Sequence, residues 1–173
     1  MKHKHHFFAG ALVLCLAGQG WTATGTAFIE GTKDDSDISG RLAFEDTPKG
    51  LKVSGLIENV ASGDHGFHIH EFGDCSDEGK NAGGHFNPSQ RPHGHAVKDG
   101  LAKAHAGDMG NLFIDEKGMG RVDLVLPGVS LTGGKMAVAG RAVIVHENKD
   151  DFGQPTGNAG GRIACGPIVL TAK

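Results

Sequence analysis

The stretch Gly120-Arg-Val-Asp-Leu-Val-Leu126 places apolar side chains at alternate positions, because single residues separate Val122, Leu124 and Leu126. Alternation with a period of two is typical of a β-strand with one buried face. The same period recurs in seven other short segments, at 27–30, 38–45, 51–58, 66–70, 111–115, 140–146 and 163–170. The sequence therefore predicts eight short strands.

Turn-forming residues separate these segments, and no segment shows a stripe of apolar residues at helical spacing. Eight short strands with turns between them predict an all-β fold, an antiparallel sandwich or barrel. Two long irregular stretches, 71–110 and 147–162, interrupt the strands. Loops of that length usually have a function.

The composition of the 173-residue chain fits one ordinary domain and excludes several classes of protein. Its 29 glycines have no three-residue period, which excludes a collagen. Acidic residues outnumber basic residues by 20 to 17, which argues against a nucleic-acid binder. The unusual count is 11 histidines, and it directs attention to metal chemistry.

The first 23 residues have the pattern of a secretory signal peptide, with a basic start, an apolar run over 7–18 and small residues after it. The run is shorter than the roughly 20 residues that a membrane span needs. Leu14 precedes Cys15 where a lipoprotein signal would place a small residue, which argues against lipid attachment. We therefore expect cleavage near residue 23, one domain over 24–173, and a periplasmic or secreted protein.

Removal of this signal peptide leaves 15 basic and 20 acidic residues, a net charge of −5, and two cysteines, Cys75 and Cys165. In an oxidising compartment these two are the candidates for one disulfide, with two separate buried thiols as the alternative. The disulfide would close a loop of about 90 residues and contribute about 4 kcal/mol in the chain-entropy model.

Eight histidines lie in the two long stretches, in the strands beside them or, for one of them, directly before such a strand. They are His65, His68, His70, His85, His93, His95, His105 and His146. His68 and His70 stand two apart in a predicted strand, so their rings project from the same face and can bind one ion together. Imidazoles suit copper and zinc, and Asp108 adds a carboxylate of the kind found in zinc sites. Without His65 and His95, six imidazoles and the Asp108 carboxylate remain as ligands. They can serve two four-coordinate metal ions only if both ions share one ring.

Several motifs resemble those of the copper/zinc superoxide dismutase family. They are Gly66-Phe-His-Ile-His-Glu-Phe-Gly-Asp74, Gly84-His-Phe-Asn-Pro88, Pro92-His-Gly94, His105-Ala-Gly-Asp-Met-Gly-Asn111, Val145-His-Glu147 with Asp150-Asp151, and Gly157-Asn-Ala-Gly-Gly-Arg-Ile-Ala-Cys-Gly166. They occur in family order over nearly the whole mature chain. The resemblance implies an eight-stranded Greek-key β-barrel with two long functional loops, and an antioxidant enzyme that converts superoxide into dioxygen and hydrogen peroxide.

The resemblance also implies one copper and one zinc ion in each subunit. The family's copper ligands correspond to His68, His70, His85 and His146, and its zinc ligands to His85, His93, His105 and Asp108. His85 would then bridge the two ions. When reduced copper dissociates from this ring, the nitrogen that bound it would become a basic site for a proton. In this scheme the copper cycles between Cu(II) and Cu(I), and the zinc is structural.

Other residues have roles that the resemblance implies. Asp150 corresponds to an aspartate that links His68 and His93 through their free nitrogens. Arg162 corresponds to an arginine over the copper that attracts the anion, and Thr156 to a threonine that narrows the entrance. The family's disulfide corresponds to a bond between Cys75 and Cys165 beside the arginine.

Some features depart from the usual pattern of the family. Cys75 stands five residues after His70, as in bacterial members, whereas the motifs at His85 and His105 resemble eukaryotic ones. We expect an exported bacterial type with some eukaryotic-like motifs. The segment 147–156 is short and lacks the charges that steer substrate in eukaryotic members, and Gln154 offers no positive field.

Two histidines are left outside the expected site. His95 could compete with His93 for zinc, but His93 keeps the eight-residue spacing from His85. His65 corresponds to a family position with a structural role.

Two other classes of protein remain alternatives. A metal-sequestering protein or a copper chaperone could use the same ligands without turnover, although related chaperone domains often lack part of the copper set or the arginine. A purely structural sandwich would not need seven metal-type residues in family order. We expect superoxide as the substrate, no nucleic-acid partner, no membrane span, and a homodimer or a monomer.

Overall fold

A computed structural model describes residues 22–171, so most of the expected signal peptide, 1–23, lies outside the described residues. The described part contains nine strands, one 3-10 turn and one short α-helix. They are β1 (Thr24–Gly31), β2 (Ser39–Thr47), β3 (Gly50–Glu58), β4 (Gly63–His70), η1 (Lys80–Ala82), α1 (Ala96–Asp99), β5 (Asp108–Ile114), β6 (Gly120–Leu126), β7 (Ala142–His146), β8 (Arg162–Pro167) and β9 (Val169–Leu170). No helix over 22–171 has the length and apolar character needed to cross a bilayer.

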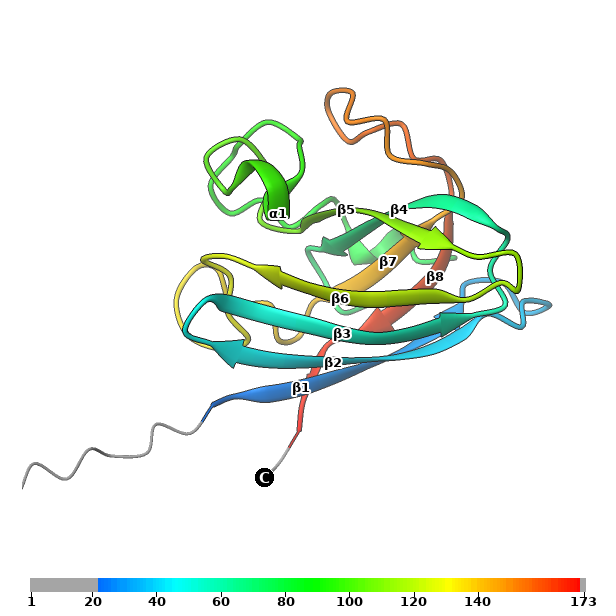
Figure 1. Ribbon diagram of the computed structural model, residues 1–173, viewed down its shortest axis with the longest axis horizontal. Helices are drawn as coiled ribbons and strands as arrows, with labels where there is room; N and C mark the ends of the chain where they lie inside the picture. The colour runs from blue at the N-terminus through cyan, green and yellow to red at the C-terminus, as the bar shows by residue number, and fades with distance from the viewer. Residues whose placement is uncertain (1–21, 172–173) are drawn as a thin grey trace, which may run out of the picture.

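The strands form one antiparallel sheet that closes on itself (Figure 1). The order is β2-β3-β6-β5-β4-β7-β8-β1, and β1 pairs with β2 to complete the circle, while the two-residue β9 adds to β1. β3 is followed in the chain by β4 but pairs with β6, so the connection crosses the barrel as in a Greek key. The predicted all-β, eight-stranded antiparallel barrel is confirmed.

Alternate side chains of the strands fill the barrel. In β6, Val122 and Leu126 are buried and Leu124 packs against the same core, as the alternation predicts. Phe44 and Phe67 are among the largest fully buried side chains. Each buried side chain of this size contributes about 1.5–3 kcal/mol of hydrophobic stabilisation.

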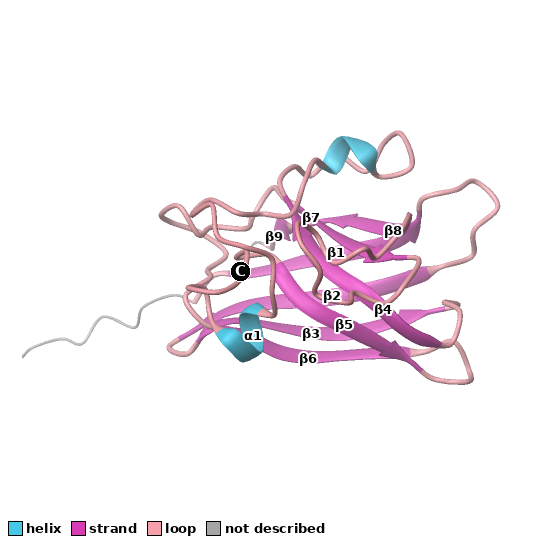
Figure 2. Cartoon of the chain, turned by 90° about the horizontal axis from the view of Figure 1, so that it is seen from above, coloured by secondary structure: helices cyan, strands magenta, loops and turns pink. Residues whose placement is uncertain are grey.

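β4 and β7 are buried on both faces, because the long loops cover their outer sides (Figure 2). Phe67 of β4 belongs to the barrel core, whereas His68 and His70 occupy the opposite face. In β7, Ile144 packs against Ala82 of the first long loop. The chain thus buries a group of polar residues between the barrel wall and its loops.

The last predicted strand, 163–170, is in fact two strands. β8 ends at Pro167, which has no N–H to donate to a neighbouring strand, and Ile168 then bonds to the main chain of Arg141 before β9 begins. The elements η1 and α1 in the first long stretch were not predicted, because three or four residues are too few to show an apolar stripe.

Candidate metal centre

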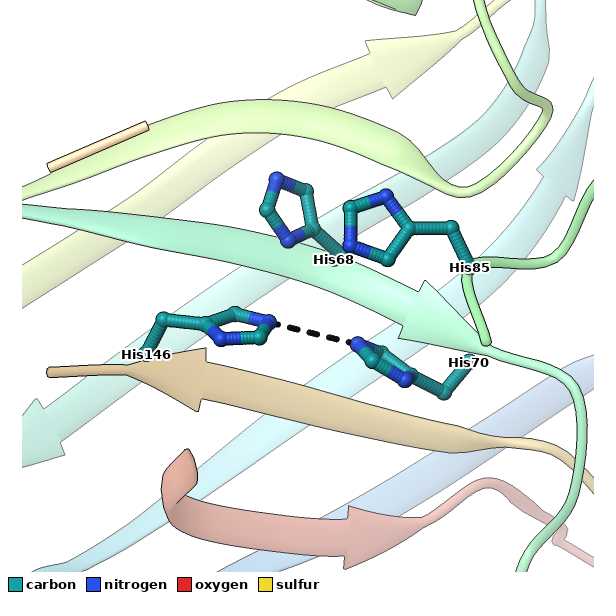
Figure 3. A group of neighbouring side chains, drawn as sticks. All are labelled: His68, His70, His85 and His146. Carbon is teal, nitrogen blue, oxygen red and sulfur yellow. Dashed lines mark hydrogen bonds between the residues drawn. The ribbon is translucent and has the colours of Figure 1, made fainter. Parts of the chain in front are cut away.

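Six histidines and two aspartates gather on the outer face of β4 and β7. His68 and His70 extend from β4, His146 from the end of β7, and His85 from the loop after β4 (Figure 3). The pairing register shifts between Gly66 and His68 and again beside His146. Such bulges change the direction of side chains, and here they occur next to two of the histidines.

Four histidines form the first group of possible metal ligands. They are His68, His70, His85 and His146, and one ligand nitrogen of each lies within 4.8 Å of the others. The Nε2 atoms of His70 and His146 are 3.3 Å apart, and the ring centroids of His68 and His85 are 4.0 Å apart (Figure 3). Four imidazole nitrogens that face one small space are a donor set that suits copper.

Three of these rings are also held at their other nitrogen by an acceptor outside the group. The contacts are His68 Nε2 with the Asp150 carboxylate at 2.8 Å, His70 Nδ1 with the Gly83 carbonyl at 3.0 Å, and His146 Nδ1 with the Gly160 carbonyl at 3.4 Å. The inward Nδ1 of His68 is buried and has no hydrogen-bond partner among the described residues. Because a buried polar atom without a partner is costly, a bound metal ion fits this position.

The second group consists of His85, His93, His105 and Asp108. The Nδ1 atoms of the three rings lie 2.8, 2.9 and 3.1 Å from the Asp108 carboxylate. The His93 Nδ1 is close to that carboxylate but makes no hydrogen bond with it, so this nitrogen is available to an ion. Three imidazoles and one carboxylate are the donors of a tetrahedral zinc site.

His85 belongs to both groups. Its Nδ1 faces Asp108 in the second group, at 2.8 Å, so its Nε2 remains for the first group. The structure thus brings together all the histidines and the aspartate that the sequence assigns to two ions, with one shared ring between them. A neutral imidazole carries a proton on one nitrogen, so this ring can bind an ion at each nitrogen only after it loses that proton.

Asp150 links the two groups. Its carboxylate is 2.8 Å from Nε2 of His68 and 3.0 Å from Nε2 of His93. The Asn111 side-chain amide donates a hydrogen bond to the Asp150 carbonyl at 2.9 Å and accepts one from the Asp150 N–H at 2.7 Å. The sequence does not reveal this pairing. Gly157 has a φ of 78°, and a Cβ there would collide with this carboxylate, so the position requires glycine.

Burial controls the charge of several of these groups. It lowers the pKa of His68 to about 4 and that of His146 to about 3, so both rings are neutral at pH 7, the state that binds a metal. Burial acts in the same direction on His93, but Asp108 and Asp150 outweigh it and raise the pKa of His93 to about 9. Burial would raise the pKa of both carboxyls, but their hydrogen bonds with the histidines hold it well below the usual range.

A cavity of about 210 Å³ opens onto the first group, and its lining includes His70, His85, His146, Thr156 and Arg162. The Arg162 guanidinium donates hydrogen bonds to three main-chain carbonyls within 79–83. These bonds use three of its five N–H groups, which leaves two donors without a protein partner among the described residues. A cation with free donors therefore lies at the wall of the cavity.

The remaining residues singled out from the sequence have clear positions. Cys75 and Cys165 form the disulfide, which ties the first long loop to β8. His95 lies outside both groups, and its ring stacks on Phe152. Both ring nitrogens of His65 contact main-chain carbonyls, so it also lies outside the groups.

The sequence of residues 38–168 matches the family described as copper/zinc superoxide dismutase. The chain belongs to this family. Copper/zinc superoxide dismutases convert superoxide, and the two histidine-rich groups are typical of their copper and zinc sites. This chain is therefore a superoxide dismutase.

Relatives in this family support the assignment over most of the chain. An extracellular copper/zinc superoxide dismutase of Brugia pahangi is 34% identical over 87% of this chain and 79% of its own length. Superoxide dismutase [Cu-Zn] A of Xenopus laevis is 43% identical over 76% and 89%. An extracellular enzyme of Caenorhabditis elegans is 36% identical over 91% and 74%. The crystal structure of the clock protein EA4 covers 97% of this chain and 100% of its own, with 36% identity and a TM-score of 0.76.

Proposed function

We propose that the first group holds the copper ion at which this dismutase works, and that the second group holds its zinc ion. The copper ligands are His68, His70, His85 and His146, and the zinc ligands are His85, His93, His105 and Asp108. The shared position of His85 supports this assignment most strongly, because one of its nitrogens faces each group. Four imidazoles suit copper, and three imidazoles with a carboxylate suit zinc.

Copper, when bound, supplies a one-electron couple, and the overall reaction turns two superoxide anions and two protons into dioxygen and hydrogen peroxide. The chain supplies a fixed geometry and a proton. His85 Nδ1 is engaged in the second group, so Nε2 is the atom that takes up and delivers a proton at the cavity. The rings of His68 and His70 keep their orientation because their outer nitrogens are hydrogen-bonded.

Arg162 binds the anionic substrate in this proposal. Its two unused N–H donors and its charge suit a small anion in a cavity next to the first group. Thr156 lines the same cavity and narrows it. A local positive group is needed because the mature chain carries an expected net charge of −5.

Replacement of this arginine tests its role. Arg162→Ala should lower the rate constant for superoxide by about tenfold or more, since it removes charge-assisted hydrogen bonds worth about 1.5–3 kcal/mol. It should also flatten the dependence of the rate on salt and leave the copper content unchanged. Arg162→Lys keeps the positive charge but lacks the paired N–H donors of the guanidinium group, so it should give an intermediate rate. Stopped-flow decay of superoxide at several ionic strengths measures both effects, and an alanine variant as fast as the parent rules out the role.

The assignment of both ions is tested by metal analysis combined with a dismutation assay with and without cyanide. We expect one copper and one zinc per chain and an activity that cyanide abolishes. Full copper loading without activity would instead support the sequestration of metal as the function.

We also propose that residues 1–23 are a cleaved signal peptide and that the domain over 24–173 works in the periplasm or outside the cell. The basic and apolar start of the chain supports this, as do the disulfide and the names of two relatives as extracellular enzymes. The spacing of Cys75 from His70 further supports an exported bacterial type. The intact mass of the exported protein should correspond to a start near residue 24, and a mass that includes Met1 would contradict cleavage.

A further inference from the structure

The loop between β7 and β8 contacts His93 in three separate ways. The Asp150 carboxylate bonds the ring Nε2 at 3.0 Å, the Phe152 ring stacks on the imidazole, and the Gln154 amide bonds the main chain. The first contact belongs to the site already described. The other two come from residues that the proposed chemistry does not use.

Gln154 pairs with both main-chain groups of His93. Its Oε1 accepts a hydrogen bond from the His93 N–H at 3.0 Å, and its Nε2 donates one to the His93 carbonyl at 2.9 Å. A side-chain amide thus makes the pair of bonds that a neighbouring strand makes in a sheet. This pairing fixes the main chain from which the imidazole extends.

Phe152 covers the imidazole from one side. Its ring lies 6.2 Å from that of His93 with an interplanar angle of 20°, and 5.7 Å from that of His95 at 14°. Phe152 is 39% exposed whereas His93 is 3% exposed, so the phenyl ring lies between the buried imidazole and the solvent side of the loop. Its backbone has a φ of 60°, a conformation that bulky residues disfavour, and its N–H bonds the Asp150 carboxylate at 2.8 Å. The ring therefore keeps its place against the local preference of its backbone.

We propose that Phe152 and Gln154 are positioning residues that clasp His93 and slow the loss of zinc. The inference rests on the proposed zinc ligation by His93. For the ion to leave, the His93 nitrogen must withdraw from the space that it shares with Asp108, and the clasp opposes that movement from the ring side and from the main-chain side. The part of the loop that contains Phe152 and Gln154 thus serves ligand retention rather than substrate steering.

The release of zinc and copper to a chromophoric chelator, followed separately in the fully loaded protein, tests the clasp. Gln154→Ala and Phe152→Ala should each release zinc about tenfold faster, as is usual when a partner of a ligand is removed. The release of copper should stay at the parent rate, because no proposed copper ligand contacts these side chains. Phe152→Tyr keeps the ring and should restore slow release, and Gln154→Glu keeps one of the two bonds and should be intermediate.

Lys149→Ala is the matched control, because Lys149 lies on the same loop, is exposed and pairs with Asp64 rather than with the site. It should release zinc at the parent rate. Parent-like zinc release from both alanine variants would overturn the clasp, and so would an equal acceleration of copper and zinc release, which would indicate general loosening. A parent protein that takes up no zinc would instead refute the proposed function, and the clasp with it.

Discussion

One buried carboxylate fixes the direction of ligand rings in both groups. Asp150 bonds the outer nitrogens of His68 and His93, so neither ring can rotate without breaking a hydrogen bond. The Phe152 N–H donates a hydrogen bond to this carboxylate, and the Asn111 amide holds the main chain of Asp150. The geometry of the two proposed ions therefore depends on a residue that ligates neither of them.

Asp150→Asn tests this dependence with almost no change in shape. The amide can accept a hydrogen bond from one ring but brings an N–H towards the other, so one imidazole loses its acceptor. We expect the affinity for zinc to fall by about 10–100-fold, the usual cost of losing such a partner. Competition with a chromophoric chelator measures the affinity.

The neighbouring Asp151 provides the control. Its carboxylate is exposed and bonds the Gly153 N–H and the Asn158 amide rather than a histidine. Asp151→Asn should therefore keep the zinc affinity of the parent. Equal affinities for Asp150→Asn and the parent would show that Asp150 has no role in zinc binding.

At the same scale, the sequence reveals some contacts and hides others. The spacing of His68 and His70 places two rings on one face of a strand, and this is visible without a structure. The pairing of Gln154 with His93 is not, because the two residues stand 61 apart and a single glutamine has no sequence signature. Asn111 bonds Asp150 across 39 residues and was equally invisible, although it ends one of the recognised motifs.

Among the elements, strands with one buried face and one solvent-exposed face are the easiest to predict. β6 alternates cleanly, and its bounds agree with the predicted segment, 120–126. β4 begins at Gly63 rather than at residue 66, because Gly63 and Asp64 are residue types typical of turns and give no sign of a strand in the sequence. Where the loops cover the barrel wall, the sequence pattern weakens, and the candidate site lies in that part of the fold.

The disulfide connects the first long loop with β8, across 90 residues of sequence. Replacement of both cysteines, Cys75→Ser with Cys165→Ser, should lower the free energy of unfolding by about 4 kcal/mol, because the unfolded chain regains the entropy of an open loop. Urea unfolding of the metal-free protein measures the change. The Arg162 guanidinium also donates hydrogen bonds to main-chain carbonyls of this loop, within 79–83. The folded loop should therefore stay in place without the disulfide.

A reductant serves as the control for this change. It should destabilise the parent by a similar amount and leave the double serine variant as it was. Equal stability of parent and variant before reduction would mean that the bond does not constrain the unfolded chain as expected.

For the molecule as a whole, the barrel and the site respond to pH in different ways. The core is apolar, so its stability is nearly independent of pH. The metal-free site buries neutral histidines beside ionised carboxylates, so its protonation differs between the folded and unfolded states. The site therefore determines how the stability of the metal-free chain changes with pH.

The metal-free chain should be most stable near pH 6.5. Below that value the unfolded chain binds protons at His68 and His146. In the folded state burial keeps the two rings neutral down to about pH 4 and pH 3. Acid therefore favours the unfolded state. Above it the protonated His93 stabilises the fold, and this contribution is lost as the pH rises through about 9. Urea unfolding across pH should show a fall of more than about 1.4 kcal/mol from pH 6.5 to 4.5, the equivalent of one pKa unit. His146→Asn should reduce that fall, and a stability that stays constant or rises towards acid would contradict the burial of neutral histidines.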